Sequence, residues 1–271
     1  MRQRSRADVS NAHSVGFLGK KTYLATCVAI WLHDNDKPYV LLCRRLNRLE
    51  VDIAVSGAPT IPKSRFSDAL ADCVQKLEDK PLVQGLHNVV LPTIGMIVPN
   101  WFLVVPKVHS FNFGQQGMGT REELSSIASS IFEAVSKPGD EMLAFEHGAL
   151  RAGSNIGCGV DHAHLHIIVS SRNFLACVWD GMSEELDACD GAAPIGEMYN
   201  GVLSEKPYYL AWMSGKTLLE QPAKNEVSQR FRRVIASAAG TPDSWNYREH
   251  PFYDNVLKTI SNFHQGKRQA A

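Results

Sequence analysis

Short β-branched runs and longer stretches with apolar residues at helical spacing follow one another along the chain. Residues 23–32 and 39–43 are rich in β-branched and aromatic side chains and flank the turn-like stretch 34–38, which predicts a β-hairpin. Similar runs predict further strands at 93–98, 101–105, 142–147, 162–170 and 208–213. The helical spacing predicts helices at 64–79, at about 120–136, at 226–239 and at 252–264.

Strands with inserted helices, without a regular strand–helix alternation, indicate an α+β fold on a largely antiparallel sheet. Residues 1–14 hold few apolar groups, so we expect a flexible N-terminal tail. The strands at 15–175 are expected to form one α+β domain, followed at 176–271 by a mainly helical C-terminal extension that packs on it. Ser64 is a candidate helix cap, and Thr120 with Glu123 a candidate capping box.

Composition and charge narrow the class of protein. Lys and Arg together number 28, as do Asp and Glu, so the formal net charge is zero. A neutral protein has no overall field that attracts a polyanion, which argues against long nucleic acid as a partner but leaves room for a local nucleotide pocket. The six cysteines form no Cys-x-x-Cys pair, and no long apolar stretch predicts a membrane span. We therefore expect a soluble cytoplasmic protein with free thiols.

The pattern with the clearest chemistry is the run His162-Ala163-His164-Leu165-His166. Side chains alternate across a strand, so the three histidines are expected to project from one face. Ala163, Leu165 and Ile167 then project from the other face, into a core. Three adjacent imidazoles are costly to bury unless an anion or a metal ion meets them.

Three interpretations compete for this run. The first is a chance row of structural histidines. The second is a metal site, although three histidines on one strand span roughly 13 Å, which is too far for one ion without a bend. The third is a phosphate site in which neutral His164 is a nucleophile that forms a covalent intermediate. The preceding glycine-rich stretch 153–160 favours the third, because exposed backbone N–H groups cradle anions.

At this point the sequence resembles the histidine-triad superfamily. The run His162-Ala163-His164-Leu165-His166, followed by Ile167-Ile168, matches the signature in which histidines alternate with apolar residues. The upstream stretch Leu103-Val104-Val105-Pro106-Lys107-Val108-His109 looks like the family's strand with its Pro-Lys-x-His end. The resemblance covers roughly residues 90–172, and residues 20–60 are candidates for the first strands of the same domain.

The resemblance implies a homodimeric α+β enzyme that cleaves or transfers nucleoside phosphates through a nucleotidyl-histidine. By position the nucleophile is His164, with His162 and His166 as orienting and phosphate-binding neighbours and His109 in the same network. The stretch that binds the nucleotide substrate is expected to include Asn155, Gly157, Gly159 and Lys107. No metal ion and no cofactor is required in this scheme.

The sequence differs from the family pattern in the segment just before the first histidine. The family often has a polar side chain near the leaving group there, whereas this chain has Gly157-Cys158-Gly159-Val160. The scheme as a whole predicts a nucleotide phosphate-ester or anhydride hydrolase. A nucleotidyltransferase or phosphorylase, which uses an acceptor other than water, is the alternative. A non-catalytic nucleotide sensor and a metal-dependent enzyme on the same histidines stay open.

The C-terminal extension holds arginines and aromatic residues close together, a combination that grips phosphates and bases. These residues are Arg230, Arg232, Arg233, Trp245, Tyr247 and His250. They form either a lid or second wall of the substrate pocket, or part of a packed helix pair whose basic face is solvated. Glu146-His147 is expected to be a strand end with a structural histidine rather than an acid–base pair. Cys158 could be a reactive thiol, but it is expected to have no chemical role, since no base is evidently paired with it.

Overall fold

The computed structural model describes residues 9–13, 26–34, 37–43, 65–71, 76–189 and 194–269. The chain divides into two compact units, Met1–Ile61 and Pro62–Ala271. The described strands of the smaller unit form a three-stranded antiparallel sheet of β1 (Val9–His13), β2 (Thr26–Asp34) and β3 (Lys37–Cys43). The predicted hairpin is confirmed by the pairing of β2 with β3. The strand β1 lies within the stretch expected to be a tail, and it pairs with β2.

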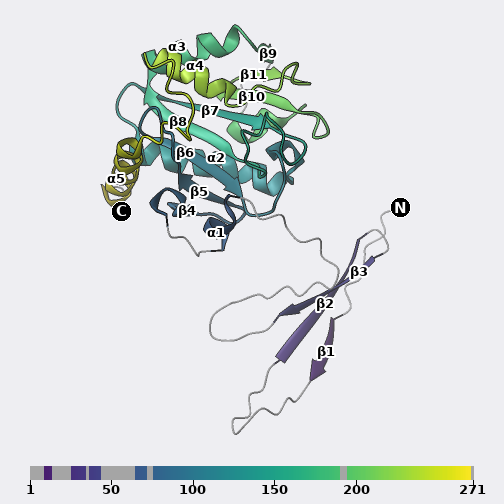
Figure 1. Ribbon diagram of the computed structural model, residues 1–271. Coiled ribbons are helices and arrows are strands. Elements are labelled where there is room, and N and C mark those ends of the chain that lie inside the picture. The colour runs from purple at the N-terminus through teal and green to yellow at the C-terminus, as the bar shows by residue number, and fades with distance from the viewer. Residues whose placement is uncertain are drawn as a thin grey trace. The chain divides into compact units, whose positions relative to one another are not determined.

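The larger unit is built on an antiparallel sheet with the order β4-β5-β6-β8-β7-β10-β11-β9 (Figure 1). Its described strands are β4 (Val83–Gln84), β5 (Asn88–Pro92), β6 (Trp101–Pro106), β7 (Asp140–Gly148), β8 (Leu165–Ser171), β9 (Asp187–Cys189), β10 (Tyr208–Met213) and β11 (Lys216–Glu220). With its helices, this sheet confirms the α+β class. The extension predicted at 176–271 does more than pack on the sheet, because it supplies β9, β10 and β11.

Helices cover both faces of this sheet. The described helices are α1 (Ser67–Leu70), α2 (Met118–Val135), α3 (Arg172–Ser183), α4 (Arg230–Ala238) and α5 (Tyr253–Gln269), with 3-10 turns at Leu77–Asp79, Phe113–Gln115 and Ile195–Tyr199. One core joins α2 to residues such as Phe102, Ile167 and Leu210. A second core joins α3 and α4, which lie side by side in Figure 1, to Trp101 and Phe145 on the opposite face.

Two predicted elements differ from the structure. The strand predicted at 93–98 lies earlier, at β5, and the following residues turn; Gly95 has a φ of 76° and its N–H donates to the Pro251 carbonyl. The helix predicted at 64–79 is limited, among the described residues, to α1 and the 3-10 turn, because residues 72–75 and the expected cap Ser64 lie outside them. Residues 93–98 are mostly buried although they turn, so their apolar character resembled that of a strand in the sequence.

The predicted capping box of the second helix is also wrong. Helix α2 begins at Met118, with Gly117 as its N-cap residue, so Thr120 is already helical. The carboxylate of Glu123 instead accepts hydrogen bonds from the backbone N–H groups of Leu86 and His87. These donors lie far away in the sequence, and the sequence pattern could not distinguish them from a local cap. In the part of the chain that the structure describes, no helix combines the length and apolar character needed to cross a bilayer.

Candidate active site

The histidine run lies where β8 begins, between the central strands β6 and β7. The sequence predicted a strand from His162, but the strand starts at Leu165, so His162 and His164 lie in the irregular segment before it. The alternation is nevertheless confirmed, because Ala163, Leu165 and Ile167 lie in the core that α2 covers. The rings of His164 and His166 are neighbours, with centroids 5.1 Å apart.

His164 is held in one orientation by the backbone beside it. Its Nδ1 lies 2.8 Å from the carbonyl oxygen of His162. A carbonyl oxygen only accepts, so Nδ1 carries the proton and the lone pair of a neutral imidazole is on Nε2. The side chain is 7% exposed. The local backbone therefore selects the tautomer that a nucleophilic Nε2 requires.

His162 and His109 form a second pair at the start of the run. The Nε2 of His162 donates to the carbonyl of Pro106 at 2.9 Å, and the Nε2 of His109 donates to the carbonyl of Asp161 at 2.7 Å. Their ring centroids lie 5.0 Å apart. The structure thus brings together all four histidines that were predicted to form the network: His109, His162, His164 and His166.

His166 has partners that sequence reasoning did not identify. The indole Nε1 of Trp101 donates to Nδ1 of His166 at 3.0 Å, which leaves the His166 proton on Nε2. The ring of Phe145 stacks on His166 with centroids 4.5 Å apart. The sheet register explains both contacts, since His166 pairs with Leu103 on β6 and with Phe145 on β7, and Trp101 is two residues from Leu103.

Burial keeps these imidazoles neutral. It lowers the pKa of His162 and of His164 to about 4, although the hydrogen bonds to Pro106 and His162 respectively oppose the change. Burial and the neighbouring His164 lower the pKa of His166 well below its ordinary value. His162, His164 and His166 are therefore uncharged near pH 7, and an uncharged imidazole is the form that can attack a phosphorus atom.

Phe66, just before α1, covers part of the row. Its ring lies 5.9 Å from that of His162 and 5.8 Å from that of His164, measured between centroids. Phe66 is fully buried in a small apolar cluster with residues of β5 and β6. No local pattern in the sequence pointed to this contact, because Phe66 and the histidines are far apart along the chain.

The glycine-rich stretch turns back toward the run. Gly157 is buried and its carbonyl accepts from Val160, whereas Asn155 and Gly159 are exposed. Cys158 is buried and has a raised pKa of about 11, because burial outweighs the hydrogen bond from the Gln229 N–H. Its Sγ also lies 3.9 Å from Nδ1 of His147, so a ring nitrogen that the sequence did not place there is next to the thiol. Lys107 does not join the row: its ammonium donates to the carbonyl of Gly85.

His147 and Glu146 lie on opposite faces of β7 and do not form a pair. His147 is buried beside the row, 6.2 Å from His166 between ring centroids, and its Nε2 accepts from the Phe231 N–H at 3.3 Å. Burial, with His164 and two arginines nearby, lowers the pKa of His147 to about 3. Burial raises the pKa of Glu146 to about 7, against the hydrogen bonds from Tyr208 and the Phe113 N–H.

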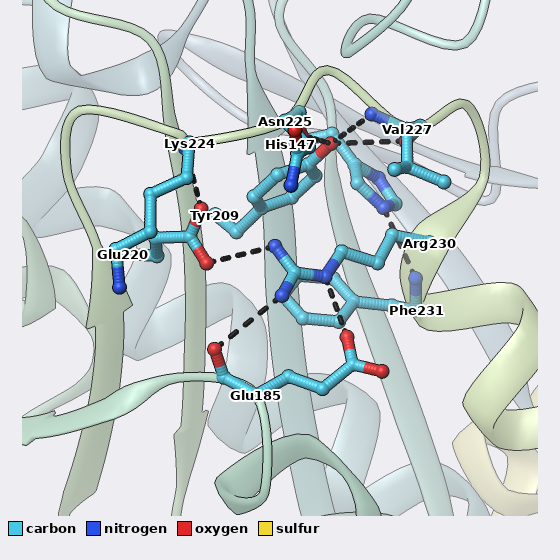
Figure 2. Close-up of polar contacts among 9 residues, drawn as sticks. All are labelled: His147, Glu185, Tyr209, Glu220, Lys224, Asn225, Val227, Arg230 and Phe231. Atoms are coloured by element: carbon cyan, nitrogen blue, oxygen red, sulfur yellow. Dashed lines mark hydrogen bonds and ion pairs between the residues drawn. The ribbon is translucent and has the colours of Figure 1, made fainter.

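Arg230, the first residue of α4, holds the C-terminal part of the chain next to His147 (Figure 2). Its guanidinium donates to the carboxylates of Glu185 at 2.6 Å and Glu220 at 2.9 Å, and it lies over the ring of Tyr209. Burial alone would lower the pKa of Arg230, but the two carboxylates raise it. The next residue, Phe231, then contacts His147. This ion-pair cluster fixes the start of α4 at the site.

The predicted basic and aromatic cluster is divided between several roles. Arg230 is structural, and Arg233 stacks over Trp245 at 3.4 Å from the ring centroid. Arg232 is buried, lies 4.9 Å from the Trp101 ring centroid and donates to the carbonyls of Trp245 and Gly95. Tyr247 and the neighbouring Arg248 reach the Cys158 carbonyl. His250 lies beside Phe252 instead.

Comparisons with known proteins give only a weak match. No protein-family model matches the chain, and neither does any curated protein. One similar solved structure is a Hit-like protein involved in cell-cycle regulation from Bartonella henselae, crystallised with an unknown ligand. The two are 18% identical over 40% of this chain and 78% of that chain, with a TM-score of 0.31. A likeness at this level carries no argument about activity.

The described side chains around the row do not form a site for a metal ion. Among the described residues, no group of three or more His, Cys, Asp and Glu side chains has an arrangement that could hold one. The ring nitrogens that are fixed here face backbone carbonyls in His109, His162 and His164. In His164 the carbonyl engages Nδ1 and leaves the lone pair on Nε2, beside the neighbouring ring of His166.

Proposed function

We propose that this protein is a nucleotide phosphate-ester or anhydride hydrolase in which Nε2 of His164 attacks the α-phosphorus of the substrate. The observation that carries the proposal is the 2.8 Å hydrogen bond between Nδ1 of His164 and the His162 carbonyl. This hydrogen bond fixes the proton on Nδ1. Burial lowers the pKa of His164 to about 4, so the lone pair that attacks phosphorus is present on Nε2 at neutral pH.

The proposed reaction has two displacements. In the first, an Nε2–P bond forms and the bond from phosphorus to the leaving oxygen breaks, with its electron pair remaining on that oxygen. In the second, water attacks phosphorus, the N–P bond breaks and its electron pair returns to Nε2, while the water loses a proton to solvent. Dividing one displacement into two lowers the barrier of each. An acceptor other than water in the second step would make the protein a transferase or phosphorylase.

The neighbours of His164 have distinct proposed roles. The proton on Nε2 of His166 makes this nitrogen a donor, suited to a non-bridging phosphate oxygen on which charge develops. Trp101 is a positioning residue, because it holds His166 in that tautomer. His162, fixed on the Pro106 carbonyl, orients His164 through its own backbone carbonyl.

The direct test is mass spectrometry of the intact protein after brief incubation with a panel of nucleoside triphosphates and dinucleoside polyphosphates. Wild type is compared with His164→Ala and with His264→Ala, a matched control because His264 is exposed on α5. We expect a nucleotidyl-sized mass increase in wild type and in the His264 variant, and none in the His164 variant.

Each other outcome is informative. The same adduct in His164→Ala would show that a different residue is the nucleophile and would overturn the proposal. Product without a trapped adduct calls for rapid quenching with denaturant at alkaline pH, because the N–P bond of a nucleotidyl-histidine is hydrolysed in acid. Loss of product formation in His164→Ala, but not in His264→Ala, would then support His164. Absence of both adduct and product from wild type across the panel would reject the hydrolase.

A non-catalytic nucleotide sensor is the second candidate. Two observations favour it: the absence of a side chain at Gly159, and the coverage of His162 and His164 by Phe66. Such a sensor would bind nucleotides, measured by calorimetry, without releasing product over hours. Binding accompanied by turnover that depends on His164 would exclude it.

A further inference from the structure

Arg248 lies in the space that a side chain at Gly159 would take. A β-carbon built on Gly159 would lie 2.6 Å from Nη2 of Arg248, well inside a normal contact. The same nitrogen donates to the carbonyl of Cys158 at 3.3 Å. Gly159 has a φ of 74°, a left-handed conformation in which glycine is strongly favoured. The loop before the histidines and the C-terminal segment are therefore in contact at this point.

Hydrogen bonds to Gln229 hold the segment that carries Arg248. The side-chain carbonyl of Gln229 accepts from the Tyr247 N–H at 3.1 Å, and its amide donates to Asn246 at 3.3 Å. The Gln229 N–H in turn donates to Sγ of Cys158. Gln229 directly precedes α4, whose first residue is the Arg230 held by Glu185 and Glu220 (Figure 2).

The guanidinium of Arg248 retains most of its binding capacity. Its side chain is exposed and lies over the ring of Tyr247, 4.8 Å from the ring centroid. Among the described residues, no carboxylate forms an ion pair with it. A guanidinium has five N–H donors, so most remain open to a ligand, and its planar geometry matches phosphate oxygens.

A second cation strengthens the positive character of this end of the site. Arg232 is buried, and its polar contacts are to the carbonyls of Trp245 and Gly95 rather than to a carboxylate. Its guanidinium lies 5.9 Å from the centroid of the Tyr247 ring, over which Arg248 also lies, and the hydroxyl of Tyr247 donates to the Cys158 carbonyl. Two guanidinium groups thus lie near the loop that leads into the histidines, and a buried, unneutralised positive charge favours an anionic ligand.

We infer that Arg248 binds the leaving group of the proposed reaction and selects substrates whose leaving group is an anionic phosphate chain. The inference rests on the proposed function. Arg248 is linked to the histidine row through Cys158, because its guanidinium donates to the Cys158 carbonyl. Sγ of Cys158 lies 3.9 Å from Nδ1 of His147, which lies beside His166. As the bond from phosphorus to the leaving oxygen breaks, the electron pair moves to an oxygen of the departing pyrophosphate, and the guanidinium stabilises that charge.

The first experiment does not depend on catalysis. Calorimetric titration with inorganic pyrophosphate compares wild type with Arg248→Gln, Arg248→Lys and Arg268→Gln, a matched loss of charge at an exposed arginine of α5. We expect binding to weaken about 10- to 100-fold in Arg248→Gln, as for the loss of a charge-assisted hydrogen bond, and less in Arg248→Lys. Equal binding by wild type and Arg248→Gln would overturn the inference.

The second experiment tests selectivity with one nucleoside and two leaving groups. Arg248→Gln is expected to lower kcat/KM for the nucleoside triphosphate about 10- to 100-fold and for the nucleoside phosphoramidate, whose leaving amine is neutral, by less than about threefold. An equal loss for both substrates would overturn the selectivity. Weaker pyrophosphate binding in Arg248→Gln, with no turnover in wild type, would reject the hydrolase while keeping the anion site.

Discussion

Acidification is expected to destabilise the larger unit steeply, because its candidate site contains neutral buried histidines. Burial gives His147 a pKa of about 3 and His162 and His164 values of about 4, below the ordinary 6.5. Such a histidine takes up its proton at a higher pH in the unfolded chain than in the folded protein. Its contribution to the free energy of unfolding is therefore fully present above pH 6.5 and is lost as the pH falls. Each group contributes a loss of about 2 kcal/mol between pH 6.5 and 5.

Glu146 acts in the opposite direction. Its pKa is raised from 4.5 to about 7, so its contribution is present below pH 4.5 and is lost as pH rises through 7. Between pH 7 and 5 it therefore adds about 2–3 kcal/mol and offsets part of the loss of roughly 6 kcal/mol from His147, His162 and His164. His166 adds to the loss. The net decrease is at least about 3 kcal/mol, a large part of the stability of an ordinary domain.

Urea unfolding followed by tryptophan fluorescence at pH 7, 6, 5.5 and 5 measures this decrease. The dependence on pH should correspond to uptake of about two or more protons on unfolding. His147→Gln should reduce that number by about one, Glu146→Gln should raise it by about one, and the exposed His264→Gln should leave it unchanged. A free energy of unfolding that stays constant within about 1 kcal/mol from pH 7 to 5 would refute the reasoning.

Two further predictions concern the residues that position the site. Trp101→Phe removes the donor to Nδ1 of His166, so steady-state kinetics should show kcat reduced about tenfold or more at a nearly unchanged KM; an increase in KM alone would contradict the positioning role. Arg230→Met leaves Glu220 without its guanidinium and should lower the urea-measured free energy of unfolding by about 2–3 kcal/mol. The double variant Arg230→Met/Glu220→Leu should recover part of this loss, whereas an equal or larger loss would show that the buried carboxylate is not its cause.

Some of the predicted elements follow from local patterns alone. The hairpin of β2 and β3, the strand β6 and the helix α2 were each predicted within a few residues, because period-two and helical spacing reflect which face of an element is buried. The same spacing misplaced β5 and did not reveal that β10 and β11 join the main sheet. Sheet order depends on pairings between distant segments, and such pairings leave no local pattern.

The order of the amino acids is enough to predict that His162, His164 and His166 alternate with core residues beside a glycine-rich loop, because alternation is a local property of an extended chain. The nitrogen of each ring that carries the proton could not be predicted in this way, since the partners are the His162 and Pro106 carbonyls and the Trp101 indole. The same is true of the contact between Arg248 and Gly159. Burial and long-range hydrogen bonding, which set tautomer and charge, depend on residues that meet only when the chain has folded.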